Sequence, residues 1–218
     1  MTDDSSHDAT LYLPKDPGSQ RDLEALRRAS AGCRGCPLHE NATQTVFGAG
    51  PPDARAVFVG ETPGDQEDRK GAPFVGPAGH MLDRALVEAG IARDEVYLTN
   101  AVKHFKFRHP EGGGKRRIHE TPSAREMRAC RPWLLAELQA VEPELVVALG
   151  ALAGKTLMGT SFRVTKERGA LMPLPEAILA GPQLVATIHP SAILRADDRE
   201  AVYAGFVDDL KVAAQALA

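Results

Sequence analysis

The chain contains four short apolar runs that are rich in β-forming residues. They are RAVFVG (55–60), EVYLTNA (95–101), ELVVAL (144–149) and QLVATIH (183–189). An almost continuous apolar run of this length is typical of a strand that is buried on both faces of a sheet. We therefore predict four interior strands.

Helical patterns occupy most of the sequence between and around these runs. The predicted helices lie at about 21–30, 77–90, 121–141, 151–159 and 197–218. Gly90 is a typical stop signal, while Thr121 is a plausible cap with Pro122 at the first helical position. Strands and helices that alternate at this spacing predict an α/β fold around a central four-stranded, mostly parallel sheet.

Polar residues follow every predicted strand. The segments are GETPGDQED after the first strand, TNAVKH at the end of the second, GALAGK after the third and HPSAIL after the fourth. In parallel sheets, ligands bind at the carboxyl ends of the strands. We therefore expect acidic, amide and imidazole groups to converge at one edge of the sheet, although polar residues are common in all loops.

Composition and length fit one globular domain. The 218 residues are 43% hydrophobic and 25% charged, both ordinary values. No apolar run approaches the roughly 20 residues that span a membrane, and the acidic N-terminus lacks the pattern of a secretory signal. We expect a flexible tail over residues 1–18, a single domain over 19–218, a cytoplasmic location and a monomer.

Positive charge is concentrated in one segment, although the net charge is −3. The cations between residues 103 and 119 are Lys103, Lys106, Arg108, Lys115, Arg116 and Arg117, and the single acid there is Glu111. A basic strip on an acidic body fits contact with a phosphate backbone. A solvated loop without function fits the charge pattern equally well.

The three cysteines are candidate metal ligands. Cys33 and Cys36 form a CxxC pair and Cys130 is distant in sequence, an arrangement that argues against a disulfide framework. Two thiolates at this spacing can bind one metal ion or cluster with ligands from elsewhere, and His104 is the best placed fourth donor. A redox-active CxxC or buried structural thiols are the alternatives, and spacing does not separate zinc from iron–sulfur.

The motifs GETPGDQED, PFVGPAG, TNAVKHFKF, ACRPWL and HPS, together with the early CxxC, resemble the iron–sulfur uracil-DNA glycosylases of family four. The loop sequence KRRIH resembles the UdgX-type branch, whose members become covalently attached to the abasic sugar after removing uracil. The resemblance extends from about residue 20 to the end of the chain. It implies a three-layer α/β/α sandwich, uracil-containing DNA as the substrate, and uracil as the product.

The resemblance also implies a [4Fe–4S] cluster bound by Cys33, Cys36, Cys130 and His104. Ordinary family-four members have a cysteine where this chain has His104, and the UdgX-type branch shares the histidine. Thr62 in GETPG departs from both patterns, because glutamine is expected in the UdgX type and a small residue in family four. Any role for a side-chain amide at that position is therefore in doubt.

The same resemblance assigns a uracil pocket. Phe74 would stack on the base, Asn100 would pair with O4 and N3–H, and His189 would stabilise negative charge at O2. The further uracil-binding residues that it implies are Gly60, Gly64, Asp65 and Gln66. Without the resemblance, Phe74 fits a core position, Asn100 a turn and His189 a helix cap.

For the reaction, the resemblance implies that His119 attacks the sugar and that Glu61 assists it. Phosphate contacts are expected from Lys115, Arg116, Arg117 and Ser191. One alternative is an ordinary hydrolytic glycosylase in which KRRIH only grips DNA. Another is a non-catalytic iron–sulfur module that binds DNA or senses redox state.

Overall fold

A sheet of five strands forms the centre of the structure, a computed structural model that describes residues 8–218. The strands, in the order in which they pair, are β2 (Val96–Asn100), β1 (Ala56–Gly60), β5 (Leu145–Leu149), β7 (Gln183–Thr187) and β6 (Leu171–Pro173). The first four are parallel, which confirms the prediction. The antiparallel edge strand β6 was not predicted, because it has only three residues and one of them is proline, which is depleted in strands.

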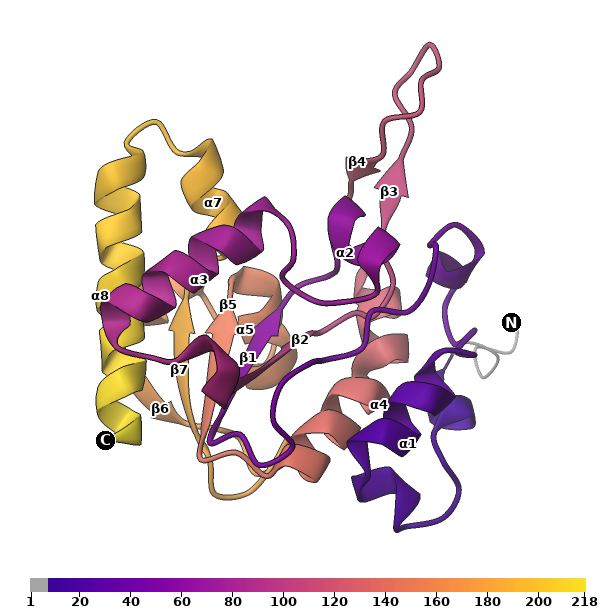
Figure 1. Cartoon of the computed structure of the whole chain (residues 1–218), viewed down its shortest axis with the longest axis horizontal. Helices are drawn as coiled ribbons and strands as arrows, with labels where there is room; N and C mark the ends of the chain where they lie inside the picture. Colours follow the sequence, from indigo (N-terminus) through magenta and orange to yellow (C-terminus); the bar gives the residue numbers. More distant parts are fainter. Residues whose placement is uncertain (1–7) are drawn as a thin grey trace.

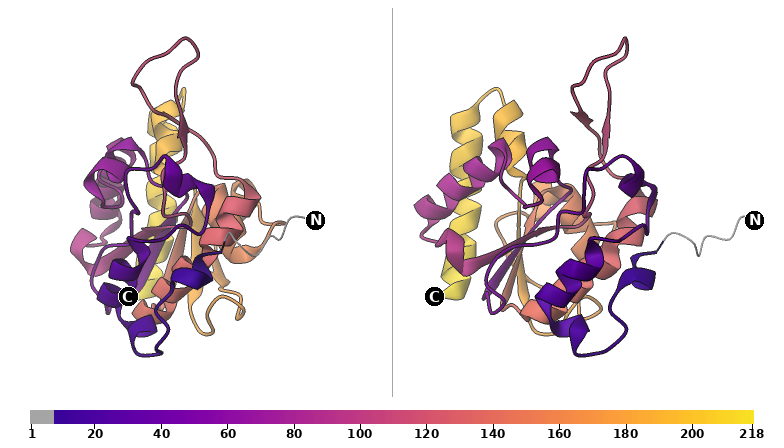
Figure 2. Two further views of the ribbon diagram at one scale, coloured as in Figure 1. Left: turned by 90° about the vertical axis from the view of Figure 1, so that its right-hand side faces the viewer. Right: turned by 45° about the vertical axis from the view of Figure 1, so that its right-hand side comes forward.

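Helices cover both faces of this sheet, as Figures 1 and 2 show. Helices α3 (Pro77–Ala89), α7 (Pro190–Arg195) and α8 (Arg199–Leu217) share one core with Phe58 and its same-facing neighbours. Helices α4 (Ala124–Val141) and α5 (Ala151–Met158), joined by α1 (Leu23–Ser30), enclose the other core with Val57 and Val59. Side chains alternate between the two faces of a strand, so every central strand contributes to both cores. The structure is the predicted three-layer α/β/α sandwich.

Shorter elements complete the chain. They are η2 (Ala9–Tyr12), η3 (Ser19–Arg21), η4 (Pro37–Glu40), α2 (Asp65–Lys70), η5 (Arg93–Glu95), β3 (Phe107–Arg108), β4 (Ile118–His119) and α6 (Val164–Glu167). Strands β3 and β4 pair antiparallel and form a hairpin that extends away from the body (Figures 1 and 2). The glycines at the hairpin tip, residues 112–114, all have positive φ, which glycine adopts without steric cost.

Two predicted helix boundaries have different outcomes. Helix α3 ends before Gly90, whose left-handed conformation is the expected stop. The prediction of Thr121 as the cap of α4 is wrong, because Ser123 caps it two residues later. The Ser123 side chain accepts from Glu126 N–H and the Glu126 carboxylate accepts from Ser123 N–H, a reciprocal pair that Thr121 lacks.

The N-terminal segment is ordered over more residues than expected. We expected a tail over residues 1–18, of which 1–7 lie outside the described residues. Residues 8–18 are not a loose tail, since η2 packs on α4 and Ala9 is only 1% exposed. Asp8 also caps η2 by accepting from Thr10 N–H. Within residues 8–218, no helix is long and apolar enough to span a membrane.

Candidate active site

The predicted polar residues meet at the carboxyl edge of the sheet. Strand β1 ends at Gly60 directly beside Asn100, the last residue of β2. Two further hydrogen bonds continue this pairing, from Ala101 N–H to the Gly60 carbonyl (2.9 Å) and from Val102 N–H to the Glu61 carbonyl (3.0 Å). The backbone that presents Asn100 is therefore fixed to the backbone that presents Glu61.

Gly60 has no side chain, and the Asn100 and Phe74 side chains fill the space beside it. A Cβ at Gly60 would overlap Asn100 Oδ1 and would lie 2.6 Å from Phe74 Cζ. Both side chains are largely buried, at 3% and 6% exposure. Phe74 also has φ of +55°, a left-handed conformation that is rare for aromatic residues and that often marks a functional site. The structure thus brings together three of the predicted uracil-binding residues.

His189 caps α7, and its ring lies near that of Phe74, with the centroids 6.4 Å apart. Its Nδ1 accepts from Ser191 N–H (3.2 Å) and lies 2.8 Å from Ser191 Oγ. Burial lowers the pKa of His189 to about 4, and the His119 and Arg195 charges act in the same direction. The ring is therefore neutral near pH 7, and an accepting Nδ1 leaves the proton on Nε2. His189 is therefore a helix cap, as its sequence position also suggests. Its contacts with Ser191 fix the ring so that the Nε2–H can act as a hydrogen-bond donor.

Glu61 and His189 both lie close to Gly150. A Cβ at Gly150 would come within 2.8 Å of Glu61 Oε1 and 2.9 Å of His189 Cβ, so glycine permits this approach. Burial raises the pKa of the Glu61 carboxyl, while the Leu152 N–H and Arg195 oppose the rise. A carboxylate with a raised pKa is a better proton acceptor.

His119 ends β4, at the base of the hairpin. Its ring centroid is 5.9 Å from that of Phe105, and it pairs with Phe107 across the hairpin. The surrounding protein lowers the pKa of His119 mainly by burial, and Arg195 lowers it further, although part of the ring is exposed. Near pH 7 His119 is thus a neutral imidazole, and a positive charge on it would lower the pKa of His189. Sequence reasoning missed Arg195, whose charge acts on both histidines and on Glu61.

Arg117 departs from its predicted role as a phosphate contact. Its guanidinium pairs with Asp65 and with Asp68 (2.6 Å to Oδ2) and lies over the rings of Phe105 and Phe107, 5.2 and 5.0 Å from their centroids. Its side chain is only 10% exposed. Two ion pairs and two rings occupy the guanidinium, so Arg117 attaches the hairpin to α2 rather than facing DNA. Lys115 and Arg116 remain exposed at the tip.

The loop before α2 carries the other predicted backbone contacts. Gly64 caps α2 without a side-chain partner, so the N–H groups of Asp65 and Gln66 at the helix start are available to a ligand. The Asp65 carboxylate is bound to Arg117 and to Arg69. Glu67, which sequence reasoning missed, accepts from Gly76 N–H (3.0 Å) and so ties this loop to the loop that carries Phe74.

The three cysteines are buried, free thiols beside α4. Cys33 Sγ accepts from Trp133 Nε1–H and Cys130 Sγ accepts from Lys103 N–H, both at 3.2 Å. Burial raises the pKa of Cys36 to about 11 and that of Cys130 to about 12, and each is raised further by neighbouring thiols. These sulfur atoms therefore share one protein region and receive the hydrogen bonds that tune metal-bound thiolates.

The structure does not arrange the four predicted ligands as a closed metal site. Among residues 8–218, no group of three or more Cys, His, Asp or Glu side chains is placed to hold a metal ion. His104 is 4% exposed, and burial followed by the His39 charge lowers its pKa to about 4. His39 is thus a second imidazole near His104, and its Nδ1 lies 2.7 Å from the Cys36 carbonyl oxygen.

Thr62 has a structural role at this junction. It is buried, and its hydroxyl donates to the His104 carbonyl at 3.0 Å. The departure at this position therefore connects the loop after β1 to the proposed fourth ligand. No side-chain amide is needed for this contact.

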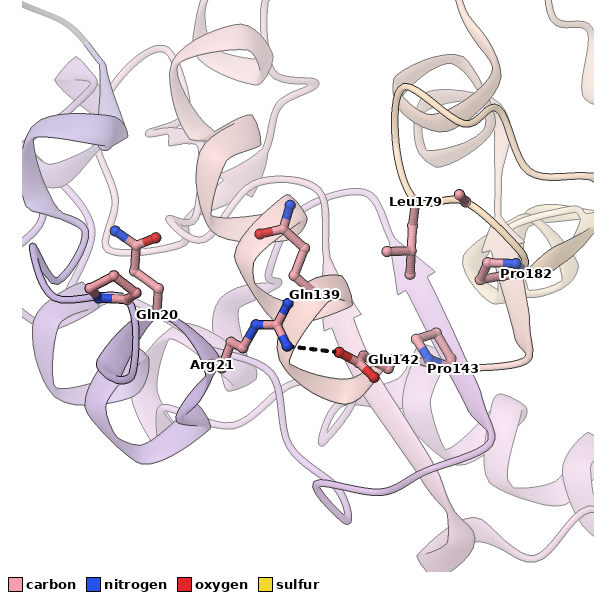
Figure 3. A pocket seen from close by; sticks show the side chains of 9 residues that line it. Gln20, Arg21, Gln139, Glu142, Pro143, Leu179 and Pro182 are labelled. Carbon is pink, nitrogen blue, oxygen red and sulfur yellow. Dashed lines mark hydrogen bonds and ion pairs between the residues drawn. The ribbon is translucent and has the colours of Figure 1, made fainter.

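Two cavities lie away from these residues. One of about 570 Å³, shown in Figure 3, is lined by residues such as Gln20, Gln139 and Leu179, with an Arg21–Glu142 ion pair of 3.4 Å. Pro143 and Pro182 in its lining precede β5 and β7, which places it at the amino ends of the strands. It is therefore at the opposite edge of the sheet from Asn100 and His189.

Comparisons with known proteins agree with this geometry. Residues 47–211 match the family described as the uracil DNA glycosylase superfamily. The chain is similar to a type-4 uracil-DNA glycosylase of Thermotoga maritima, with 42% identity over 174 residues, which cover 79% of this chain and 83% of the relative. A type-4 uracil-DNA glycosylase of Pyrobaculum aerophilum is 36% identical over 177 residues, covering 80% and 85%. A type-5 uracil-DNA glycosylase of the same organism is 32% identical over 157 residues, covering 65% and 63%.

Proposed function

We infer, because this chain belongs to the uracil DNA glycosylase superfamily, that it excises uracil from DNA by breaking the bond between uracil N1 and the sugar C1′. The observation that carries this inference is the convergence of Asn100, Phe74 and His189 at one edge of the sheet. Phe74 and His189 face each other with ring centroids 6.4 Å apart. An amide, an aromatic face and an imidazole donor are the groups that an extruded uracil needs.

Each group has a separate task in the reaction. Asn100 offers a donor and an acceptor side by side, which match uracil O4 and N3–H and mismatch cytosine. Phe74 supplies a stacking surface. When the N1–C1′ bond breaks, its electron pair moves into the base, and the Nε2–H of His189 stabilises the negative charge that develops at O2.

We propose that His119 then attacks C1′ and becomes covalently attached to the sugar. The cation left at C1′ accepts an electron pair from a ring nitrogen, and the ring proton passes to a base such as Glu61. The lowered pKa of His119 supports this step, because a neutral imidazole has the required lone pair near pH 7. Its position on a hairpin clamped by Arg117 supports it as well.

Hydrolysis is the second candidate outcome. The type-4 relatives favour it, and the half-buried Glu61, which like His189 lies close to Gly150, is a carboxylate that could activate a water molecule. In that case the hairpin only grips DNA and the product is free abasic DNA.

One experiment separates these outcomes. The protein is incubated with a labelled oligonucleotide that contains one uracil, and an identical oligonucleotide with thymine is the control. We expect free uracil by mass spectrometry and a protein–DNA band that survives boiling in detergent. Uracil release without the band would assign hydrolysis, and no uracil release would overturn the glycosylase assignment itself.

We also propose that Cys33, Cys36, Cys130 and His104 hold a [4Fe–4S] cluster. The cluster would join the N-terminal segment, the turn after β2 and α4 into one support for the hairpin. Purified protein should be brown and contain iron and sulfide, whereas colourless protein with one zinc would overturn the proposal. His104→Cys should retain iron because a thiolate replaces the imidazole. His39→Ala is the control, and iron loss in that variant rather than in His104→Ala would transfer the fourth position to His39.

A further inference from the structure

A fully buried ion pair lies beneath the uracil-recognition residue. Lys103 and Glu137 both have side chains that are 0% exposed, and the Lys103 ammonium donates to Glu137 Oε2. Lys103 belongs to the turn after β2, whereas Glu137 lies on α4. Neither residue has a role in the reaction derived above.

The ammonium has three N–H groups and three acceptors. Besides Glu137, it donates to Thr99 Oγ1 at 2.6 Å and to the backbone carbonyl oxygen of Asn100 at 2.7 Å. An ammonium has only three protons, so these three acceptors use all of its donors and fix its position. One of the three fixes the peptide group of the residue that reads uracil.

The Glu137 carboxylate is also held by several hydrogen bonds. Glu137 accepts from Gly48 N–H (2.8 Å), Tyr97 Oη–H (3.1 Å) and Thr99 Oγ1–H (2.9 Å to Oε2). Strand β2 therefore contributes two of the donors that hold Glu137 in place. No buried side-chain polar atom in the part of the chain that the structure describes lacks a partner.

The backbone of Lys103 is anchored from two further directions. Its N–H donates to Cys130 Sγ (3.2 Å), and its carbonyl accepts from Val46 N–H (2.8 Å). The ammonium thus starts from a fixed backbone and reaches back by three residues to Asn100. Such an arrangement allows little freedom in the Asn100 peptide.

Stability alone is a weak reason for this pair. Replacing a buried ion pair with neutral residues of similar size is often neutral or stabilising, whereas removing one partner is strongly destabilising. What a neutral pair cannot supply is the charged donor to the Asn100 carbonyl. The ion pair is therefore better explained by its effect on the position of the Asn100 backbone than by stability.

We propose that Lys103, oriented by Glu137, is a positioning residue that holds the Asn100 backbone so that its side-chain amide is aligned with uracil O4 and N3–H. The proposal rests on the proposed glycosylase function. It assigns Lys103 no contact with substrate. Its consequence is that neutralising the pair should impair chemistry even in a protein that is stably folded.

The test compares Lys103→Met, Glu137→Gln and the double variant. Each single variant leaves one buried charge unpaired and should lower the thermal unfolding midpoint by roughly 10 °C. The double variant should recover most of that loss. Its rate of uracil release, measured in a single turnover with saturating enzyme, should still fall roughly 10- to 100-fold. The enzyme concentration that gives half the maximal rate should not change, because Lys103 and Glu137 are fully buried and so make no contact with DNA.

Leu210→Ala is the control for general loosening. Leu210 is fully buried in the other core on α8, which among the strands packs mainly on β7 and β5, so its truncation should lower the unfolding midpoint by a similar amount and leave the Lys103–Glu137 pair intact. Iron content and visible absorbance are measured in every variant, because Lys103 N–H contacts Cys130. The proposal is wrong if the double variant releases uracil at the wild-type rate, or if Leu210→Ala is slowed as much. Absence of uracil release by the wild-type protein would instead refute the proposed function.

Discussion

The proposed uracil pocket and the β3–β4 hairpin are held in place by different structural means. The pocket residues Gly60 and Asn100 end two paired parallel strands, β1 and the edge strand β2, and are buried. The hairpin has two residues in each strand, and its glycine tip is exposed. The pocket is held by the sheet itself, whereas the hairpin is held at its base by Arg117, with Asp65 and Asp68 as its partners.

In the proposed function, this difference separates uracil recognition by the pocket from attack on C1′ by the hairpin. Reading O4 and N3–H requires an amide held within a fraction of an ångström, which a strand end in a packed core provides. Attack on C1′ requires a nucleophile that approaches after DNA has bound, which suits a projecting hairpin. Substitutions in the pocket and in the hairpin should therefore have separable effects, from complete loss of the adduct to a small change in salt dependence.

The largest effect is expected from His119→Ser. This change removes the imidazole nitrogen that would bond to C1′, so the detergent-resistant adduct should disappear completely. Uracil release should continue, because the pocket is unchanged and a serine leaves room for water. Gel analysis and uracil quantification measure the two outcomes, and peptide mass spectrometry locates the sugar in the wild-type adduct. A cross-link that persists in His119→Ser, or a sugar found on another residue, would exclude His119.

His189→Ala should slow uracil release by roughly 10²–10³-fold, the usual loss for one donor that stabilises developing charge. Adduct formation should slow by the same factor, because no electrophilic sugar exists before the base leaves. The measurement is a single-turnover time course of both products. An adduct rate that falls without the release rate would contradict the assignment of His189 to bond cleavage.

The pH dependence of release should report Glu61. Its pKa is raised above 4.5 by burial, so its carboxylate form is lost as the pH falls through that raised value, and the rate should fall there. His119 stays neutral at pH values below its ordinary 6.5, since its pKa is lowered, and the profile should therefore be flat between about 6.5 and 8. Glu61→Gln should be slower and should lack the acid limb. An acid limb that survives in this variant would assign the titration to another group.

The smallest effect concerns salt. Lys106 pairs with Glu126 at 2.9 Å, Arg108 lies 3.6 Å from Glu120, and Arg117 is enclosed. Lys115 and Arg116 are thus the hairpin cations most available to phosphate. Lys115→Gln and Arg116→Gln should each reduce the slope of log affinity against log salt by roughly 0.7–0.9. Binding to a uracil-free oligonucleotide measures this slope, and Lys106→Gln is the matched control that should leave it nearly unchanged.

Local patterns were sufficient for much of the fold. The four parallel strands, the stop at Gly90 and the meeting of polar loops at one sheet edge follow from apolar runs and glycine conformation, which depend on neighbours in sequence. The proposed pocket residues were predicted from motifs that resemble a known family, and Gly60, Asn100 and Phe74 lie together in the structure. Strand β6 was not predicted, because its three residues, one of them proline, carry no periodic signal.

Which charges pair with each other was decided by the tertiary structure. Arg117 looked like a phosphate contact because it stands in a run of cations, but its partner Asp65 lies 52 residues away. Lys103 belonged to the same basic strip, yet it is buried against Glu137, 34 residues away on another element. A sequence shows the sign of each charge but not the distance between charges, and Coulomb energy and desolvation both depend on that distance and on burial.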